Sequence, residues 1–194
     1  MANTNDPEGP VFSADLFPKR HAPWHDWVIK FPSPDLYVFS RAYEQAADLL
    51  VDSLDDKDSG GILSIPIIHL YRHPLETSIK NILTCFGEAQ GIDPQAVRNR
   101  SHQLEDQLAD LTTIAEHAGE PLTNESRGFI QKIHAEDPKG MKARYPTSKD
   151  GKEDLLKNID SFHLAPFTQD ARATLNELYH LTMTLHLGPV SDEY

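Results

Sequence analysis

The chain of 194 residues contains one cysteine and has no long apolar segment. A single cysteine, Cys85, excludes a disulfide within the chain and favours a reducing compartment. No apolar run approaches the roughly 18 residues of a membrane-spanning helix, and the opening MANTNDPEGP does not resemble a signal peptide. We therefore expect a cytoplasmic protein that does not associate with a membrane.

Basic residues are also scarce in this chain. Lysine and arginine together number 18 against 30 aspartates and glutamates, which gives a formal charge of −12. A protein that binds nucleic acid over its whole surface is usually basic. Contact with RNA or DNA would therefore require a local basic patch.

Alternating patterns typical of β-strands are few, whereas apolar residues at helical spacing are frequent, so we predict an all-α fold. The length favours one domain. Residues 1–32 are rich in proline and polar residues and predict an irregular arm, with residues 33–194 as the helical domain. Trp24 and Trp27 would pin the arm to the helices, or would offer an aromatic platform to a base or ligand.

Local signals predict where the helices begin and end. Ser33 would cap the first helix and Gly60-Gly61 would stop it. In that first helix, apolar residues repeat at helical spacing at Phe39, Ala42, Ala46, Leu49 and Leu50. The later helices are expected over residues 63–90, from near Ser101 to Gly119 with His102 in the first turn, from about Thr123, and from Pro166 to Leu187.

The second predicted helix has two adjoining faces. Its apolar face comprises Ile68, Tyr71, Leu75, Ile79, Ile82 and Phe86. At about 100° per residue, its ionisable residues fall within roughly a third of the circumference beside that face; they are His69, Arg72, His73, Glu76 and Lys80. A charged band that borders the core favours a buried polar network or the wall of a site. The alternatives are a ladder of surface ion pairs and a buried pair that fixes helix packing.

A long basic connection, residues 135–157, is predicted before the last helix. It contains a third of the basic residues of the chain, namely Lys139, Lys142, Arg144, Lys149, Lys152 and Lys157. Loops this long in a compact domain are often functional. The functional interpretation is phosphate binding, and the alternative is an ordinary solvated loop.

Three blocks in a fixed order carry a family resemblance that spans roughly residues 35–187. They are Leu70-Tyr71-Arg72-His73-x-Leu75-Glu76-x-x-x-Lys80; Ser101-His102-x-Leu104; and Asp137-Pro138-Lys139-Gly140 followed by Arg144-Tyr145-Pro146 and Lys149-Asp150-Gly151. This pattern resembles bacterial HEPN-like proteins (higher eukaryote and prokaryote nucleotide-binding domain). The resemblance implies an up-and-down bundle of four to five helices, a homodimer, and a role in prokaryotic defence or stress response.

Some members of that family are metal-independent ribonucleases, and others have no known catalysis. The active members carry an arginine, four to six residues and then a histidine, and two such motifs form one site in a dimer. Here Arg127 and His134 have that spacing, with six residues between them. Arg98 and His102 have only three residues between them, which departs from the pattern.

We therefore weigh three functions. The first is a non-catalytic or weakly catalytic module that binds RNA, a nucleotide or a protein partner; its binding residues would be Lys139, Lys142, Arg144, Tyr145 and Lys149. The second is an endoribonuclease, which needs a base, an acid and a cation near the phosphate; its candidates are Arg72, His73, Glu76, His102, Arg127 and His134. The third is a metal site at His69, His73 and Glu76. The favoured function predicts no cofactor.

Overall fold

All regular secondary structure is helical in residues 35–54, 57–99, 102–142, 144–145 and 163–187, which a computed structural model describes. The elements are α1 (Leu36–Asp52), α2 (Lys57–Phe86), the 3-10 helix η3 (Glu88–Gln90), α3 (Pro94–Asn99), α4 (Leu104–His117), α5 (Asn124–Glu136) and α6 (Leu164–Leu187). The predicted all-α bundle is confirmed. These helices belong to one compact unit, residues 33–194, and the predicted arm over residues 1–32 lies outside the described residues.

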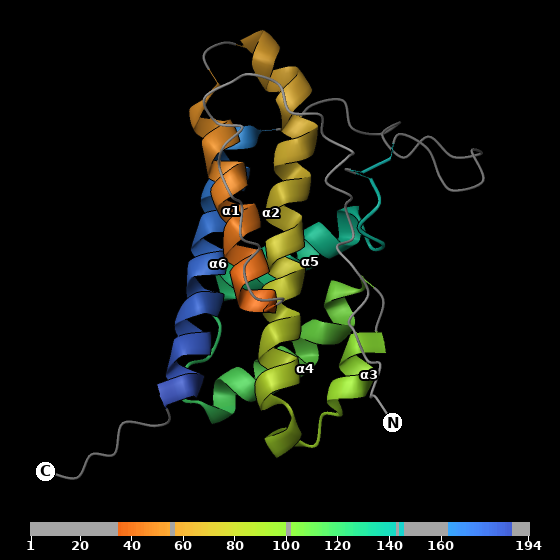
Figure 1. The fold of residues 1–194 in the computed structure, drawn as a ribbon, viewed down its shortest axis with the longest axis vertical. Helices are drawn as coiled ribbons and strands as arrows, with labels where there is room; N and C mark the ends of the chain where they lie inside the picture. Colours follow the sequence, from red (N-terminus) through yellow and green to blue (C-terminus); the bar gives the residue numbers. More distant parts are fainter. Residues whose placement is uncertain (1–34, 55–56, 100–101, 143, 146–162, 188–194) are drawn as a thin grey trace, which may run out of the picture. The chain divides into compact units, whose positions relative to one another are not determined.

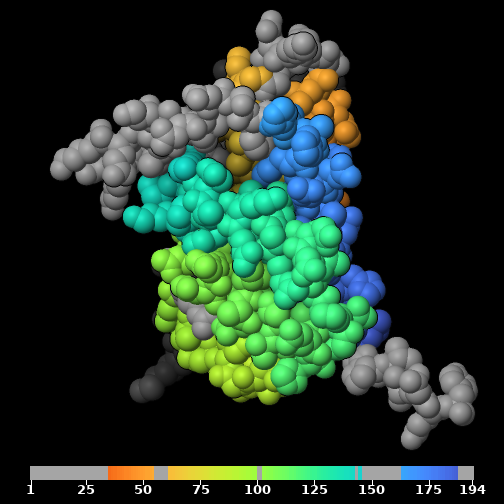
Figure 2. All heavy atoms as spheres, turned by 180° about the vertical axis from the view of Figure 1, so that it is seen from behind, coloured from red at the N-terminus to blue at the C-terminus, as the bar shows by residue number. Residues whose placement is uncertain are grey.

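Helix α2 is the central element of this unit. It is 30 residues long and packs against α1, α3, α4 and α6. Figure 1 shows α1 and α2 running antiparallel, with α6 beside them and pointing the same way as α2. Seen from behind, α4 and α5 cover the other side of the bundle, with α6 along one edge (Figure 2). A residue on α2 can therefore reach several other helices.

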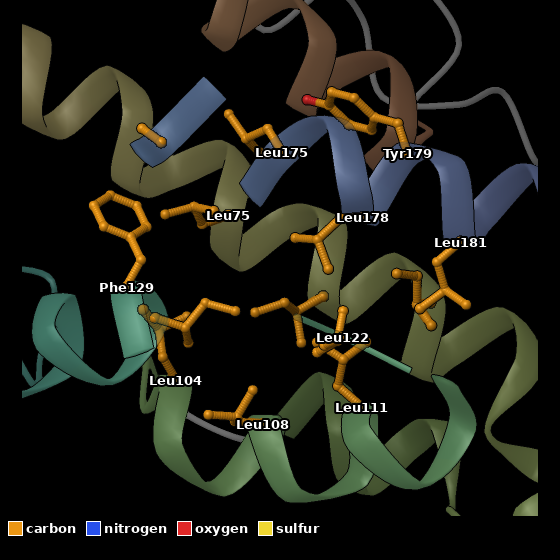
Figure 3. Close-up of a cluster of buried hydrophobic side chains, with 14 of the residues drawn as sticks. Leu75, Leu104, Leu108, Leu111, Leu122, Phe129, Leu175, Leu178, Tyr179 and Leu181 are labelled. Atoms are coloured by element: carbon orange, nitrogen blue, oxygen red, sulfur yellow. The ribbon is translucent and has the colours of Figure 1, made fainter. Parts of the chain in front are cut away.

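The predicted apolar face of α2 forms the centre of the core. Tyr71, Leu75, Ile79 and Ile82 have no exposed surface, and side chains of α4, α5 and α6 pack around them. Figure 3 shows leucines of α4 and α6 and Phe129 of α5 meeting α2 in one apolar cluster. Burial of each large apolar side chain contributes roughly 1.5–3 kcal/mol. This packing holds α2 helical through Pro66 and Pro74.

The predicted stop of the first helix at Gly60-Gly61 is wrong. Helix α1 ends at Asp52, with Ser53 as its C-cap, and both glycines lie inside α2. A glycine inside a helix costs only about 1 kcal/mol relative to alanine, which the packing of a 30-residue helix readily offsets. Asp35 caps α1 by accepting a hydrogen bond from the Tyr37 amide at 2.8 Å, and Ser33 lies outside the described residues.

The buried face of α1 coincides only in part with its apolar repeat, of which Leu50 packs against the core. Phe39 and Leu49 are 43% and 71% exposed, whereas Ser40, Glu44 and Ala47 are buried. The Ser40 hydroxyl forms hydrogen bonds with the Pro74 carbonyl at 3.0 Å, the Ser78 hydroxyl at 2.6 Å and the Tyr179 hydroxyl at 2.9 Å. A polar residue at this position is therefore fully hydrogen-bonded, which removes the cost of burying it.

The other helix ends differ from prediction by a few residues. Helix α3 was not predicted, because six residues are too few for a clear apolar repeat. Helix α4 begins at Leu104, so His102 precedes it rather than lying in its first turn. Helix α5 begins at Asn124, next to the predicted start at about Thr123, which is its N-cap, and α6 begins at Leu164 rather than Pro166. None of the described helices is long and apolar enough to span a membrane.

Candidate functional site

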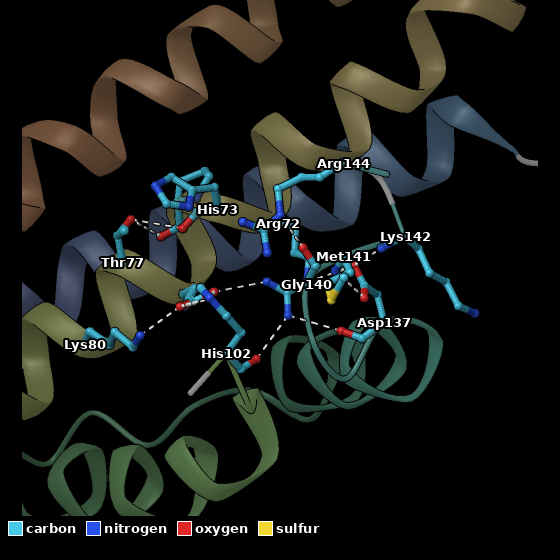
Figure 4. A network of polar contacts seen from close by, with 12 residues as sticks. Arg72, His73, Thr77, Lys80, His102, Asp137, Gly140, Met141, Lys142 and Arg144 are labelled. Carbon is cyan, nitrogen blue, oxygen red and sulfur yellow. Dashed lines mark hydrogen bonds and ion pairs between the residues drawn. The ribbon is translucent and has the colours of Figure 1, made fainter. Parts of the chain in front are cut away.

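Arg72 of α2 lies at the centre of a buried polar network and is only 4% exposed. Its Nη1 donates a hydrogen bond to Oε2 of Glu76 at 3.1 Å, one turn along the same helix. Its Nη2 donates to the backbone carbonyls of His102 and Asp137, both at 3.1 Å (Figure 4). One guanidinium thus joins α2 to the segment before α4 and to the segment after α5.

The carboxylate of Glu76 is contacted by three side chains, although Glu76 is only 3% exposed. Lys80 Nζ lies 2.8 Å from Oε1, His102 Nδ1 lies 2.8 Å from the same oxygen, and Arg72 binds Oε2. Burial by itself would raise the pKa of Glu76, but the hydrogen bonds from Lys80 and His102 outweigh it and lower the pKa from 4.5 to about 2. Glu76 is therefore ionised at neutral pH.

Asp137 organises the basic connection where it leaves α5. Its carboxylate accepts hydrogen bonds from the backbone amides of Met141 at 2.7 Å and Lys142 at 3.2 Å. Its Oδ2 also lies 3.7 Å from Nε of Arg72, as an ion pair. The segment therefore turns around one carboxylate and is held against α2 by the same residue.

Gly140 closes this turn directly over Arg72. Its φ angle is +64°, and its amide donates to the Asp137 carbonyl at 3.1 Å. A Cβ added at Gly140 would lie 2.7 Å from Nη1 of Arg72. Only glycine combines this backbone conformation with so close an approach to a side chain.

Basic side chains follow this turn. We call residues 137–142 together with Arg144 and Tyr145 the basic segment. Within it, Arg144 Nε donates to the Gly140 carbonyl at 2.6 Å, and the Arg144 guanidinium lies 5.8 Å from the centre of the Tyr145 ring. Lys142 Nζ forms a longer ion pair, 3.8 Å, with Glu136 at the end of α5. Arg144 and Tyr145 are both exposed.

Two histidines of α2 lie within the electrostatic reach of Arg144. The rings of His69 and His73 are 6.0 Å apart, and the Tyr43 ring of α1 lies 4.4 Å from that of His73. Burial lowers the pKa of His69, and the positive charges of Arg144 and Arg72 lower it further. Burial also lowers the pKa of His73, against the opposing charge of Glu76. Both rings are therefore neutral near pH 7.

His102 pairs with Glu76 in a defined orientation. An ionised carboxylate only accepts hydrogen bonds, so Nδ1 of His102 carries the proton that faces Glu76. The side chain of His102 is 47% exposed. A carboxylate that orients a solvent-accessible imidazole in this way is an arrangement used in proton transfer.

The structure brings together only some of the residues that the sequence nominates. Arg72, Glu76 and His102 are in direct contact, and His73 directly follows Arg72 on α2. Arg127 instead contacts Asn124 at 2.6 Å, and His134 contacts Glu105 at 3.3 Å, so both use partners outside the network. Among the binding candidates, the basic segment contains Lys139, Lys142, Arg144 and Tyr145, whereas Lys149 lies outside the described residues, as do Lys152 and Lys157.

Sequence reasoning did not assign Asp137 or Gly140 to the site. The tetrapeptide Asp137-Pro138-Lys139-Gly140 contains the available signal, since aspartate followed by proline and then glycine is typical of a tight turn. Tyr43 was also missed. Nothing in its sequence context marks it as the neighbour of a histidine 30 positions away.

The part of the chain that the structure describes offers no ligand set for the metal site considered above. Across the described ranges, no three histidine, cysteine, aspartate or glutamate side chains gather where they could hold a metal ion. Glu76, which was expected to complete His69 and His73, is already bound by Arg72, Lys80 and His102.

Comparisons with known proteins do not assign a family to this chain. No protein-family model matches the chain, and neither the curated proteins nor the solved structures contain a significant match.

Proposed function

We propose that this chain is a HEPN-like helical module, non-catalytic or weakly catalytic, that binds the phosphate groups of RNA or a nucleotide. The proposed phosphate site comprises His69, His73, Lys142, Arg144 and Tyr145. The observation that carries the proposal is the attachment of the basic segment to α2 through Arg72 and Asp137. This attachment holds the exposed Arg144 within electrostatic reach of two neutral imidazoles.

Several properties of these residues suit a phosphate ligand. The hydrogen bond to Gly140 uses only Nε of Arg144, so the two Nη groups take no part in it. A planar guanidinium can donate two parallel hydrogen bonds to a phosphate group. Tyr145 offers an exposed ring on which a base could stack. Neutral His69 and His73 can donate one ring N–H each, and can become charged beside a phosphate.

The local charge also supports the proposal in an acidic protein. Arg72 and Lys80 offset Glu76 and Asp137 inside the network. Lys139 and Arg144 therefore add positive charge at the surface without an acidic partner among the described residues, and Lys142 has only a distant one. A chain with a formal charge of −12 needs such a local group of cations if it is to bind the phosphate backbone of RNA.

The binding test uses fluorescence anisotropy with a fluorescein-labelled single-stranded RNA. We expect Lys142→Gln/Arg144→Gln to weaken binding about tenfold or more, because the double variant removes two cations that would bind phosphate. The matched control is Arg98→Gln/Lys132→Gln, which removes the same charge from exposed positions on α3 and α5. Equal weakening by both pairs would show a general charge effect and would contradict this site.

A homodimer and a role in defence or stress response remain part of the proposal, supported by the family resemblance alone. A protein partner is the alternative ligand for the same module. Sedimentation of the purified chain tests the dimer directly: a monomer at micromolar concentration would remove the shared, two-motif site from consideration.

A second candidate function is a metal-independent endoribonuclease. The observation in its favour is the Glu76–His102 pair, in which a buried carboxylate orients a half-exposed imidazole. His102 would then move a proton, and Arg144 would stabilise phosphorane charge. In excess chelator, cleavage of a mixed RNA pool that is abolished in His102→Ala or His134→Ala would establish this function. Cleavage of equal rate in wild type and both variants would indicate a contaminant.

A further inference from the structure

A cavity of about 530 Å³ lies at the end of the bundle where α2, α4 and α6 finish. Its lining includes Cys85 and Phe86 of α2, Glu88 of η3, Ile114 and His117 of α4, and Leu185 of α6. Its volume is within the roughly 300–1,000 Å³ of small-molecule pockets. No residue of the Arg72 network or of the basic segment lines it, so it is separate from the proposed phosphate site.

The electrostatics of this cavity favour a positively charged ligand. Each of the three helices contributes residues of its last turn, and a helix carries partial negative charge at its C-terminal end. Glu88 adds a carboxylate at the exposed rim. None of the described residues that line the cavity is a lysine or an arginine. The fields of the three helix ends and of Glu88 therefore add, and His117 is the single basic side chain among the described lining residues.

The remaining lining favours an organic rather than an inorganic cation. Phe86, Ile114 and Leu185 present apolar surface, and the Phe86 and His186 rings form a T-shaped pair with centroids 4.8 Å apart. An aromatic face attracts an ammonium group. A metal ion would need several oxygen or nitrogen ligands, and no such cluster is found in the described part of the chain.

We propose that this cavity binds a small organic ammonium ligand, with its charged group near Glu88 and the helix ends and its apolar body against Phe86, Ile114 and Leu185. The ligand class is a primary or quaternary amine that carries an aromatic or aliphatic body. This site does not depend on RNA binding.

The test compares three probes with one aromatic body and different charges: phenethylammonium, 2-phenylethanol and phenylacetate. Isothermal titration calorimetry measures affinity on the full chain. We expect phenethylammonium to bind with a Kd on the order of 1 mM or tighter, and the neutral and anionic probes to bind at least about tenfold more weakly. Glu88→Gln should weaken phenethylammonium binding, whereas the matched Glu125→Gln, on an exposed turn of α5, should leave it unchanged.

The alkylation rate of Cys85 reports whether the ligand binds in this cavity. This residue is the only cysteine of the chain, it is exposed, and it lines the cavity. Saturating phenethylammonium should slow its alkylation by N-ethylmaleimide, while phenylacetate should not. Equal affinity for the ammonium and the alcohol, or the absence of both heat and protection at 20-fold the expected Kd, would overturn the proposal.

Discussion

Gly140 lies against the guanidinium of Arg72 so closely that a Cβ at position 140 would be 2.7 Å from Nη1. The two residues belong to elements far apart in the sequence, the segment after α5 and the middle of α2. Their contact explains how an otherwise solvent-exposed basic segment is fixed in place. It also makes the attachment testable by a change of one methyl group.

Gly140→Ala should destabilise the protein by about 2 kcal/mol or more, because alanine at a φ of +64° is strained and its methyl group would displace Arg72. Gly128→Ala is the matched control. It lies inside α5, where a Cβ would meet no atom within 4 Å, and should stabilise the helix by about 0.5–1 kcal/mol. Urea denaturation measures both, and a neutral Gly140→Ala would contradict the close contact.

Glu76→Ala should lower the free energy of unfolding by about 3–5 kcal/mol, because it removes the closer of the two carboxylates that pair with the buried Arg72. His102→Ala should cost about 1 kcal/mol or less, since the His102 ring is 47% exposed and water replaces its contact. Thermal denaturation followed by circular dichroism compares the two. Small and equal shifts would show that the network does not stabilise the fold.

The stability contributed by Glu76 should depend on pH in a predictable window. The folded state lowers the pKa of Glu76 from 4.5 to about 2, so the unfolded chain takes up the proton first as the pH falls. The contribution is therefore complete above about pH 4.5 and is progressively lost toward pH 2. The difference in unfolding free energy between wild type and Glu76→Gln should shrink as the pH falls from 6 to 3. A constant difference would contradict the depressed pKa.

His69 and His73 should titrate below the usual histidine range. Burial lowers the pKa of both rings from 6.5, with help from Arg144 at His69. Two-dimensional NMR of the imidazole resonances measures the two pKa values, and the variants His69→Gln and His73→Gln assign each resonance to its residue. Saturating RNA should raise both pKa values, because a phosphate anion favours the charged ring. Values above 6.5 in the free protein would place the rings in a different environment.

Helical periodicity predicted much of this structure. It assigned the all-α class, the apolar face of α2 and the position of Arg72 and Glu76 beside the core, and their burial confirms that position. Periodicity succeeds here because a residue on a long helix has only one angular position relative to the apolar face. The same reasoning failed on α1, where hydrogen-bonded Ser40 is buried and Leu49 is exposed.

The partners of Arg72 could not be predicted from the sequence. Two of its three acceptors are backbone carbonyls, which every residue possesses, and the carbonyl of Asp137 is 65 residues away in the chain. The close approach of Gly140 to Arg72 likewise depends on the tertiary fold. Gly60-Gly61 was misread as a helix stop because local propensity is weaker than the packing of α2.

The salt dependence of RNA binding tests the proposed phosphate site most directly. On a single strand, each cation that binds a phosphate contributes about 0.7 to the slope of log Kd against log salt concentration, so Lys142→Gln/Arg144→Gln should reduce the slope by about 1.4. Arg98→Gln/Lys132→Gln should leave the wild-type slope unchanged. A slope that is the same in all three proteins, or an absence of RNA binding by wild type, would contradict the proposal that the segment fastened by Arg72 binds phosphate.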